Sequence, residues 1–140
     1  MDFENKIGPL RKKTLLVVED DASARLLIKH LLDRLDIEIL ESETGEEALE
    51  LIEDSSFEGM LLDIALGTGI NGLALGEKIK TDQRYKNIPM IAITAYEKRL
   101  LGNIEDLGFT GYLQKPYSAQ ELKMLLHEQS LTKRGNKITL

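Results

Sequence analysis

Five short apolar runs alternate along this chain with longer segments in which apolar residues recur at helical spacing. Runs such as "TLLVV" and "GMLLD" are almost continuously apolar, as are strands buried on both faces of a parallel sheet. The segment "SARLLIKHLLDRL" is expected to place apolar side chains on one face of a helix, namely Leu27, Ile28, Leu31, Leu32 and Leu35. This alternation predicts an α/β fold, in which helices cover both faces of a parallel sheet. The expected strands are residues 14–18, 37–40, 59–63, 88–95 and 111–114, and the expected helices are residues 23–35, 44–55, 72–82, 98–108 and 118–129.

Local signals mark the ends of several helices. Thr44 stands before "GEEALELIEDS", where its hydroxyl would cap a helix whose first turn is acidic. Asp21 is placed to cap the first helix in the same way. Ser118 is followed by Glu121 three residues later, which is the pattern of a capping box. Gly108 is typical of the residue that ends a helix, so we expect the fourth helix to stop there.

A chain of 140 residues is long enough for one domain with its own hydrophobic core. No gap between the expected elements has room for a second domain. We therefore expect one domain over residues 14–128, with flexible tails or linkers at residues 1–13 and 130–140. The sequence has no cysteine, which excludes disulfides, zinc–thiolate sites and cysteine nucleophiles. We expect His30 and His127 to be surface residues on helices.

The net charge of −6, from 24 acidic and 18 basic residues, argues against direct binding to nucleic acid, which requires a basic face. No apolar run approaches the roughly 20 residues that cross a bilayer. The N-terminal "MDFENKIG" lacks the apolar core of a secretory signal. We therefore expect a cytoplasmic protein with no membrane partner.

Acidic side chains follow two of the expected strands, at the edge where open α/β sheets place their binding sites. Glu19, Asp20 and Asp21 follow the first strand, and Asp63 ends the third. Carboxylates this close repel one another unless they become protonated or share a cation. Oxygen ligands of this kind suit Mg²⁺, which binds a few carboxylates and keeps several waters. The acidic cluster therefore predicts a magnesium site.

A hydroxyl and an amine follow two further strands at the same edge. Thr94 is placed near the end of the fourth strand, and Lys115 follows the fifth strand and precedes Pro116. An aspartate carboxylate can attack phosphorus and form an acyl phosphate. A metal ion, an ammonium group and a hydroxyl can stabilise the charge on the transferred phosphoryl group. These residue types at neighbouring strand ends predict phosphoryl transfer to an aspartate.

Four segments, "LLVVEDD", "LLDIALG", "IAITA" and "GFTGYLQKPY", resemble the receiver domain of two-component response regulators in their order and separation. The resemblance covers residues 14–128 and implies a flavodoxin-like (βα)5 fold with a doubly wound parallel sheet and strand order 2-1-3-4-5. The roles that it implies are Asp63 as phosphoacceptor, Glu19, Asp20, Asp63 and the carbonyl of Ala65 as Mg²⁺ ligands, Thr94 and Lys115 as catalytic partners, Thr94 and Tyr112 as switch residues, and Pro116 after a cis peptide bond.

The resemblance implies a phosphoacceptor signalling module of a phosphorelay rather than a metabolic enzyme. A sensor histidine kinase or a histidine phosphotransfer protein would supply the phosphoryl group from a phosphohistidine. No effector domain follows the last expected helix in this sequence, so we expect output through a downstream protein partner or a homodimer. A stand-alone regulator and a part of a hybrid sensor kinase both fit the sequence.

Other functions fit the residues less well. A phosphohydrolase with an aspartate nucleophile would need a second acid two residues later as general acid, where this chain has Ala65. A flavin or nucleotide carrier would need a glycine-rich or hydroxyl-rich phosphate loop where this chain has "EDDA". A degenerate receiver that acts only as a protein-interaction scaffold is the main alternative, although all the chemical residues are present. For Tyr112, the role of an ordinary strand aromatic stays open.

The chain departs from the family pattern at several positions. Glu19 stands where aspartate is commoner. The loop "ALGTGINGL" after Asp63 lacks the usual proline, is one residue longer and carries three glycines, so we expect it to be mobile. Ala65 cannot hydrogen-bond an attacking water, and the ring of Tyr96 is placed to shield the phosphoryl group. We therefore expect slower self-dephosphorylation than in receivers with amide or acidic residues at these two positions.

Overall fold

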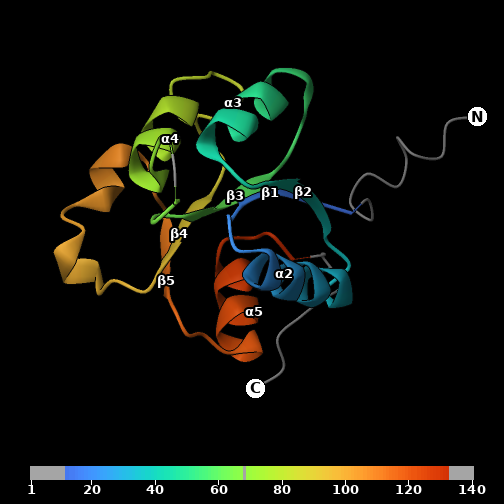
Figure 1. Ribbon diagram of the computed structural model, residues 1–140. Coiled ribbons are helices and arrows are strands. Elements are labelled where there is room, and N and C mark those ends of the chain that lie inside the picture. The colour runs from blue at the N-terminus through green and yellow to red at the C-terminus, as the bar shows by residue number, and fades with distance from the viewer. Residues whose placement is uncertain (1–11, 68, 133–140) are drawn as a thin grey trace, which may run out of the picture.

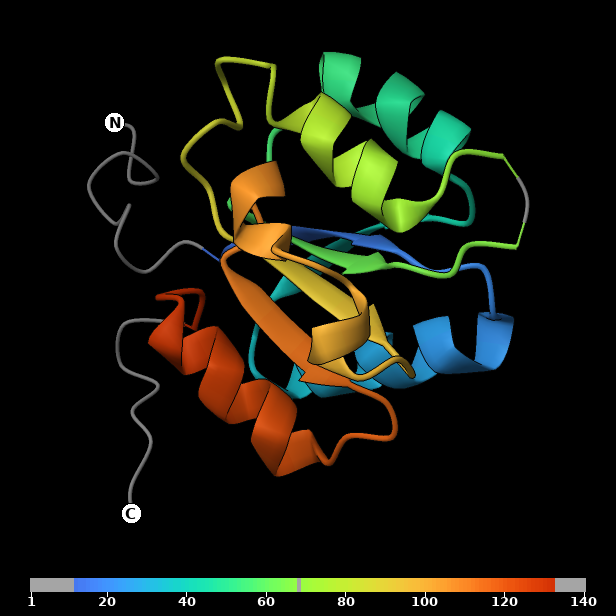
Figure 2. The same ribbon diagram turned by 90° about the vertical axis from the view of Figure 1, so that its left-hand side faces the viewer.

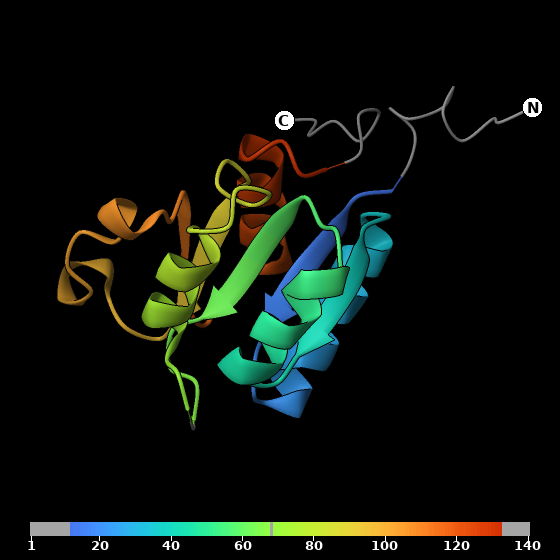
Figure 3. The same ribbon diagram turned by 90° about the horizontal axis from the view of Figure 1, so that it is seen from above.

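A five-stranded parallel sheet forms the centre of the computed structural model, which describes residues 12–67 and 69–132. The strands are β1 (Thr14–Val18), β2 (Glu38–Ser42), β3 (Gly59–Asp63), β4 (Met90–Thr94) and β5 (Gly111–Gln114). They stand in the order β2-β1-β3-β4-β5, and every neighbouring pair is parallel. Figure 3 shows the arrows of β1 and β3 side by side and pointing the same way. The predicted fold class and strand order are confirmed.

Helices cover both faces of the sheet (Figure 1). They are α2 (Ala22–Arg34), α3 (Gly45–Asp54), α4 (Gly72–Ile79) and α5 (Ala119–Glu128). In Figure 1, α3 and α4 lie above the sheet, and α2 and α5 lie below it. Successive strand residues point to opposite faces, so Leu16 packs in the core under α3 and α4, whereas Leu15 packs in the core over α2 and α5. Among the described residues, none of the helices combines the length and apolar character needed to cross a membrane.

The three predicted N-terminal helix caps are confirmed. Thr44 and Asp21 each accept a hydrogen bond from a backbone N–H in the first turn of α3 and α2, respectively. Ser118 and Glu121 form the capping box of α5, because each side chain accepts from the other residue's backbone N–H. These bonds satisfy donors that an uncapped helix would leave without a partner.

The connection between β4 and β5 differs from the prediction of a helix over residues 98–108. Two short 3-10 helices are found instead, η2 (Lys98–Leu100) and η3 (Ile104–Leu107). Gly102, which lies between them, has a φ of 75°, and this left-handed conformation interrupts a helix. Within the two short helices only Ile104 is buried. An α-helix gains most of its stability by packing an apolar face, and this segment buries too little of one.

The folded part of the described chain extends beyond α5. Leu131, at 2% exposure, packs in the core that α2 and α5 cover, and Thr132 is also buried. Both lie in the segment, residues 130–140, that we expected to be a tail. The remaining predicted tails, residues 1–11 and 133–140, lie outside the described residues.

Candidate functional site

Three carboxylates meet at the carboxyl edge of β1 and β3. Glu19 and Asp20 directly follow β1, and Asp63 is the last residue of the neighbouring strand β3. One side-chain oxygen of each lies within 4.8 Å of those of the other two. Glu19 and Asp63 are buried, at 1% and 5% exposure, whereas Asp20 is exposed. Figure 2 shows the reason for their meeting, because the connections after β1 and β3 leave the sheet at the same end.

The amine of Lys115 lies against two of these carboxylates. Its Nζ is 2.8 Å from Glu19 Oε1 and 3.4 Å from Asp63 Oδ2. Lys115 directly follows β5, and the peptide bond between Lys115 and Pro116 is cis. Burial lowers the pKa of Lys115, but the hydrogen bond to Glu19 and the charges of Asp63 and Glu19 outweigh burial and raise this pKa above its usual value. The amine is therefore positively charged at neutral pH.

The three carboxylates of the acidic cluster outnumber the single amine, that of Lys115, which pairs with them. Burial raises the pKa of Glu19 to about 6, although the hydrogen bond from Lys115 partly lowers it. In the described part of the chain, no other set of histidine and acidic side chains gathers in this way. Hard oxygen ligands with an excess of negative charge fit a divalent cation such as Mg²⁺. The chemistry of the donor set therefore agrees with the predicted magnesium site.

Thr94 and Tyr112 are connected through the backbone of Tyr96. Thr94 is 1% exposed at the end of β4, and it follows the residue that pairs with Asp63. Its Oγ1 accepts a hydrogen bond of 3.1 Å from the Tyr96 N–H. The hydroxyl of Tyr112, on β5, donates to the carbonyl of Tyr96. Thr94 and Tyr112 therefore share a hydrogen-bond partner, the backbone of Tyr96.

The loop after Asp63 returns closely against the backbone of that residue. The Ala65 N–H donates to Asp63 Oδ1 at 3.0 Å, and the Gly72 N–H donates to the Ile64 carbonyl at 3.1 Å. A Cβ at position 72 would overlap the carbonyl oxygen of Asp63. We interpreted Gly72 as a sign of a mobile loop, but this close approach is what requires glycine there. Gly72 is the first residue of a predicted amphipathic helix, and this position could have indicated that it packs closely against the preceding strand.

Arg25 on α2 supports the turn that carries Glu19, a role that our sequence analysis did not predict. Its Nη1 donates to the Glu19 carbonyl at 2.8 Å, and its Nε donates to Glu41 Oε1 at 3.2 Å. Because Glu41 lies on β2, Arg25 joins this edge strand to the turn after β1. An arginine in an amphipathic helix looks like any other exposed charge until its partners are known.

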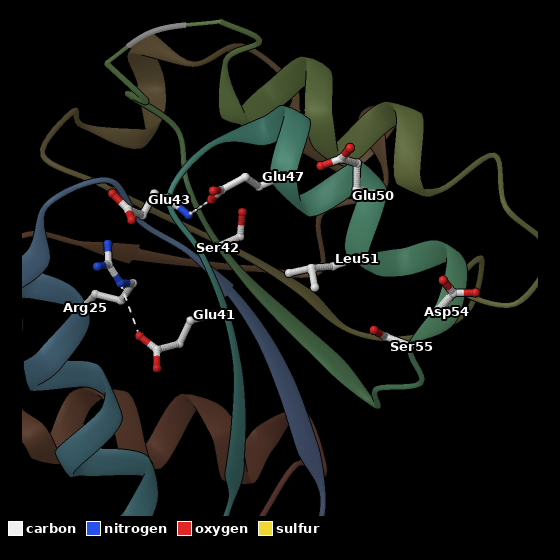
Figure 4. Close-up of a pocket in the computed structure, with 9 residues that line it drawn as sticks. All are labelled: Arg25, Glu41, Ser42, Glu43, Glu47, Glu50, Leu51, Asp54 and Ser55. Atoms are coloured by element: carbon white, nitrogen blue, oxygen red, sulfur yellow. Dashed lines mark hydrogen bonds and ion pairs between the residues drawn. The ribbon is translucent and has the colours of Figure 1, made fainter.

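A hollow of about 530 Å³ lies along β2 and α3 (Figure 4). Figure 4 shows Arg25 paired with Glu41 on one side of it and Asp54 at the other. None of the predicted site residues lines it. The nine lining residues are Arg25, Glu41, Ser42, Glu43, Glu47, Glu50, Leu51, Asp54 and Ser55. The hollow therefore does not include the acidic side chains, although Arg25, which lines it, bonds to the Glu19 carbonyl.

Solved structures share this fold. The chemotaxis response regulator CheY4 of Vibrio cholerae superposes with a TM-score of 0.79 at 23% identity, over 84% of this chain and 98% of that one. The receiver domain of sensor histidine kinase PA1611 from Pseudomonas aeruginosa PAO1 has a TM-score of 0.75 at 25% identity, over 85% of this chain and 98% of that one. That structure has a magnesium ion coordinated in its active site cleft. The fold and the acidic edge therefore define a CheY-like α/β protein.

Sequence comparison gives the family. The model of the response regulator receiver domain matches residues 15–127, and the chain belongs to this family. Chemotaxis protein CheY1 of Helicobacter pylori is 37% identical over 111 residues, which cover 78% of this chain and 90% of that protein. Histidine kinase P4 of Formosa agariphila is 32% identical over 124 residues, which cover 87% of this chain and 9% of the kinase. The protein is thus a receiver domain of two-component systems, with relatives among chemotaxis proteins and histidine kinases.

Proposed function

We propose that this receiver domain accepts a phosphoryl group on Asp63 from the phosphohistidine of a sensor histidine kinase or a histidine phosphotransfer protein, in a reaction that requires Mg²⁺. The observation that supports this most is the buried Asp63 carboxylate, which contacts Lys115 and lies within 4.8 Å of the Glu19 and Asp20 oxygens. A domain that served only as a scaffold would have no use for buried like charges, which are costly to desolvate.

The carboxylate of Asp63 would be the nucleophile. One of its oxygens forms the new O–P bond, the N–P bond of the phosphohistidine breaks, and the electron pair of that bond stays on the imidazole nitrogen. Glu19, Asp20, Asp63 and the carbonyl of Ala65 would hold Mg²⁺, which supplies neutralising charge for the phosphoryl oxygens when bound.

Lys115 and Thr94 would bind the remaining phosphoryl oxygens. Lys115 Nζ is already 3.4 Å from Asp63 Oδ2. A small movement would therefore bring it into a charge-assisted hydrogen bond with a phosphoryl oxygen on that carboxylate. A Thr94 hydroxyl that turned to the phosphoryl group would leave the Tyr96 N–H without its present acceptor. Because Tyr112 donates to the same residue, the two side chains would act together as a switch that a downstream protein partner reads.

Intact mass after incubation with Mg²⁺ and acetyl phosphate tests the proposal. We expect the wild-type protein to gain one phosphoryl group, and Asp63→Asn to gain none. A chelator should also prevent the gain. Asp33→Asn, which changes an exposed aspartate on α2, is the matched control and should behave as the wild type. No gain in the wild type with any phosphodonor would contradict the proposal and leave the scaffold alternative.

We also propose that the acyl phosphate is long-lived. Ala65 is exposed beside Asp63 and has no side-chain group that could orient an attacking water. Tyr96 stands two residues beyond Thr94, where its ring would shield the phosphoryl group. Ala65→Asn should therefore increase the rate at which phosphorylated protein loses its phosphoryl group, as followed by intact mass after removal of the donor. An unchanged rate would show that another residue sets the lifetime.

A further inference from the structure

Backbone N–H groups of the loop after Asp63 donate to carboxylates at three points. This loop is the segment that lacks the usual proline and is rich in glycine, so its own conformational preferences are weak. The carboxylates come from three different parts of the chain. The bonds run from Ala65 N to Asp63 Oδ1 (3.0 Å), from Gly67 N to Asp20 Oδ2 (2.8 Å) and from Ile70 N to Glu46 Oε2 (3.1 Å).

Two of these carboxylates belong to the acidic cluster, and the third does not. Asp20 and Asp63 would each bind Mg²⁺ or the phosphoryl group during the reaction. Glu46 lies in the first turn of α3, outside the cluster, so the reaction does not engage it. A carboxylate in that turn also interacts favourably with the helix dipole. Of the three carboxylates, Glu46 is therefore the one that the proposed reaction does not engage.

Close packing surrounds Glu46. Gly69 has a φ of 73°, and a Cβ at that position would overlap the carboxylate oxygens of Glu46. A Cβ on Gly45 would overlap the side chain of Ile70. Glycine at both positions thus lets the loop lie directly on the first turn of α3. The contact is specific, because a larger residue at either position would push the two segments apart.

We propose that Glu46 is a positioning residue for phosphoryl transfer to Asp63. It holds residues 69–70 against α3. Two residues further on, the Gly72 N–H donates to the Ile64 carbonyl, so the same contact restrains the residue that precedes Ala65. Small displacements of groups around a reacting centre can cost large factors in rate, so a loosened loop should slow the reaction. The inference rests on the proposed phosphoacceptor function and adds a residue outside the acidic cluster to it.

The test compares Glu46→Ala with Glu46→Gln, whose amide oxygen still accepts a hydrogen bond. Glu50→Ala is the matched control, because it removes an exposed glutamate one turn further along α3. Phosphorylation is followed by intact mass at saturating Mg²⁺ and acetyl phosphate. Glu46→Ala should lower the rate constant about fivefold and speed hydrogen exchange of the Ile70 amide by a similar factor. Glu46→Gln should stay within about twofold of the wild type, as should the control.

The thermal midpoint separates positioning from stability, and we expect all these variants to lie within about 3 °C of the wild type. Gly69→Ala disturbs the same contact from the loop. Combined with Glu46→Ala it should slow phosphorylation little beyond Glu46→Ala alone, although strain at a φ of 73° should lower stability in either background. A wild-type rate in Glu46→Ala, or an equal defect in Glu46→Gln, would overturn the positioning role. If the wild type itself is not phosphorylated, the proposed function fails first and this inference fails with it.

Discussion

Two connections of the sheet differ in how they are held. Between β2 and β3, α3 begins at the Thr44 cap and buries Ala48 and Ile52. Between β4 and β5, the β4–β5 connection (residues 95–110) has two 3-10 helices that bury Ile104 alone, and neither helix has a side-chain cap. The first connection therefore has a capped helix with a packed apolar face. The second has short uncapped helices, and its buried side chains are Ile104 and Phe109.

Tyr85 extends the contrast to the end of α3. The single hydrogen of its hydroxyl is shared between the Ile52 carbonyl, at 3.0 Å, and the Ser55 carbonyl. Its ring stacks on Phe57, with the ring centroids 4.2 Å apart. The difference indicates where conformational change costs least, because segments with few buried contacts open with small free energies. The weakly held connection begins directly after Thr94, where the proposed switch would act.

The largest expected effect comes from emptying the apolar face of α3. Ile52→Ala should lower the free energy of unfolding by about 2–5 kcal/mol, because it leaves a cavity in the core. Leu100→Ala in η2 is the matched change in the other connection, where the side chain is 59% exposed, and it should change stability by less than about 0.5 kcal/mol. Urea denaturation measures both. Equal losses would break the comparison.

The hydroxyl of Tyr85 should have the next largest effect. Tyr85→Phe keeps the ring stack but leaves two carbonyls at the end of α3 without this donor, and should cost about 1–3 kcal/mol. Tyr96→Phe removes a hydroxyl from a side chain that is 53% exposed, and urea denaturation should show it within about 0.5 kcal/mol of the wild type. A neutral Tyr85→Phe would show that the end of α3 does not need this bond.

Gly102→Ala tests the conformation of the β4–β5 connection through the sign of its effect. With a φ of 75°, an alanine there is strained, and the free energy of unfolding should fall by about 1 kcal/mol. Steric overlap with neighbouring residues does not contribute to this loss, because a Cβ at position 102 meets no atom within 4 Å. An α-helix through this connection would instead gain stability from the same change, since alanine is the better helix former. Thermal or urea unfolding of this single variant distinguishes the two conformations.

The smallest expected effect is local. Thr94→Val keeps the volume of the buried side chain but removes the acceptor of the Tyr96 N–H. We expect hydrogen exchange of that amide to become about tenfold faster, while global stability falls by less than about 1.5 kcal/mol. Exchange of the amides in α3 should become faster only as far as the loss of global stability requires. Equal acceleration in α3 would mean that the two connections do not respond separately.

The site was predictable because its residues stand at strand ends. Once the order of parallel strands is known, Glu19, Asp20 and Asp63 must meet at one edge, since β1 and β3 are neighbours. The β4–β5 connection was not predictable in the same way. Its leucines and Ile104 recur at helical spacing, but spacing does not say whether a surface exists for them to cover. The bond between Glu46 and Ile70 had no signal at all, because an acidic first turn is common in helices.

By itself, the sequence determined the strands, three of the helix caps and the types of residue at the carboxyl edge, because each depends on neighbours within a few positions. Only the tertiary structure decided that Lys115 pairs with Glu19, 96 positions away, and that Glu46 accepts from Ile70, 24 positions away. It also decided that the β4–β5 connection is not an α-helix. Contacts over such separations depend on how complete elements pack against one another, and no local pattern records that packing.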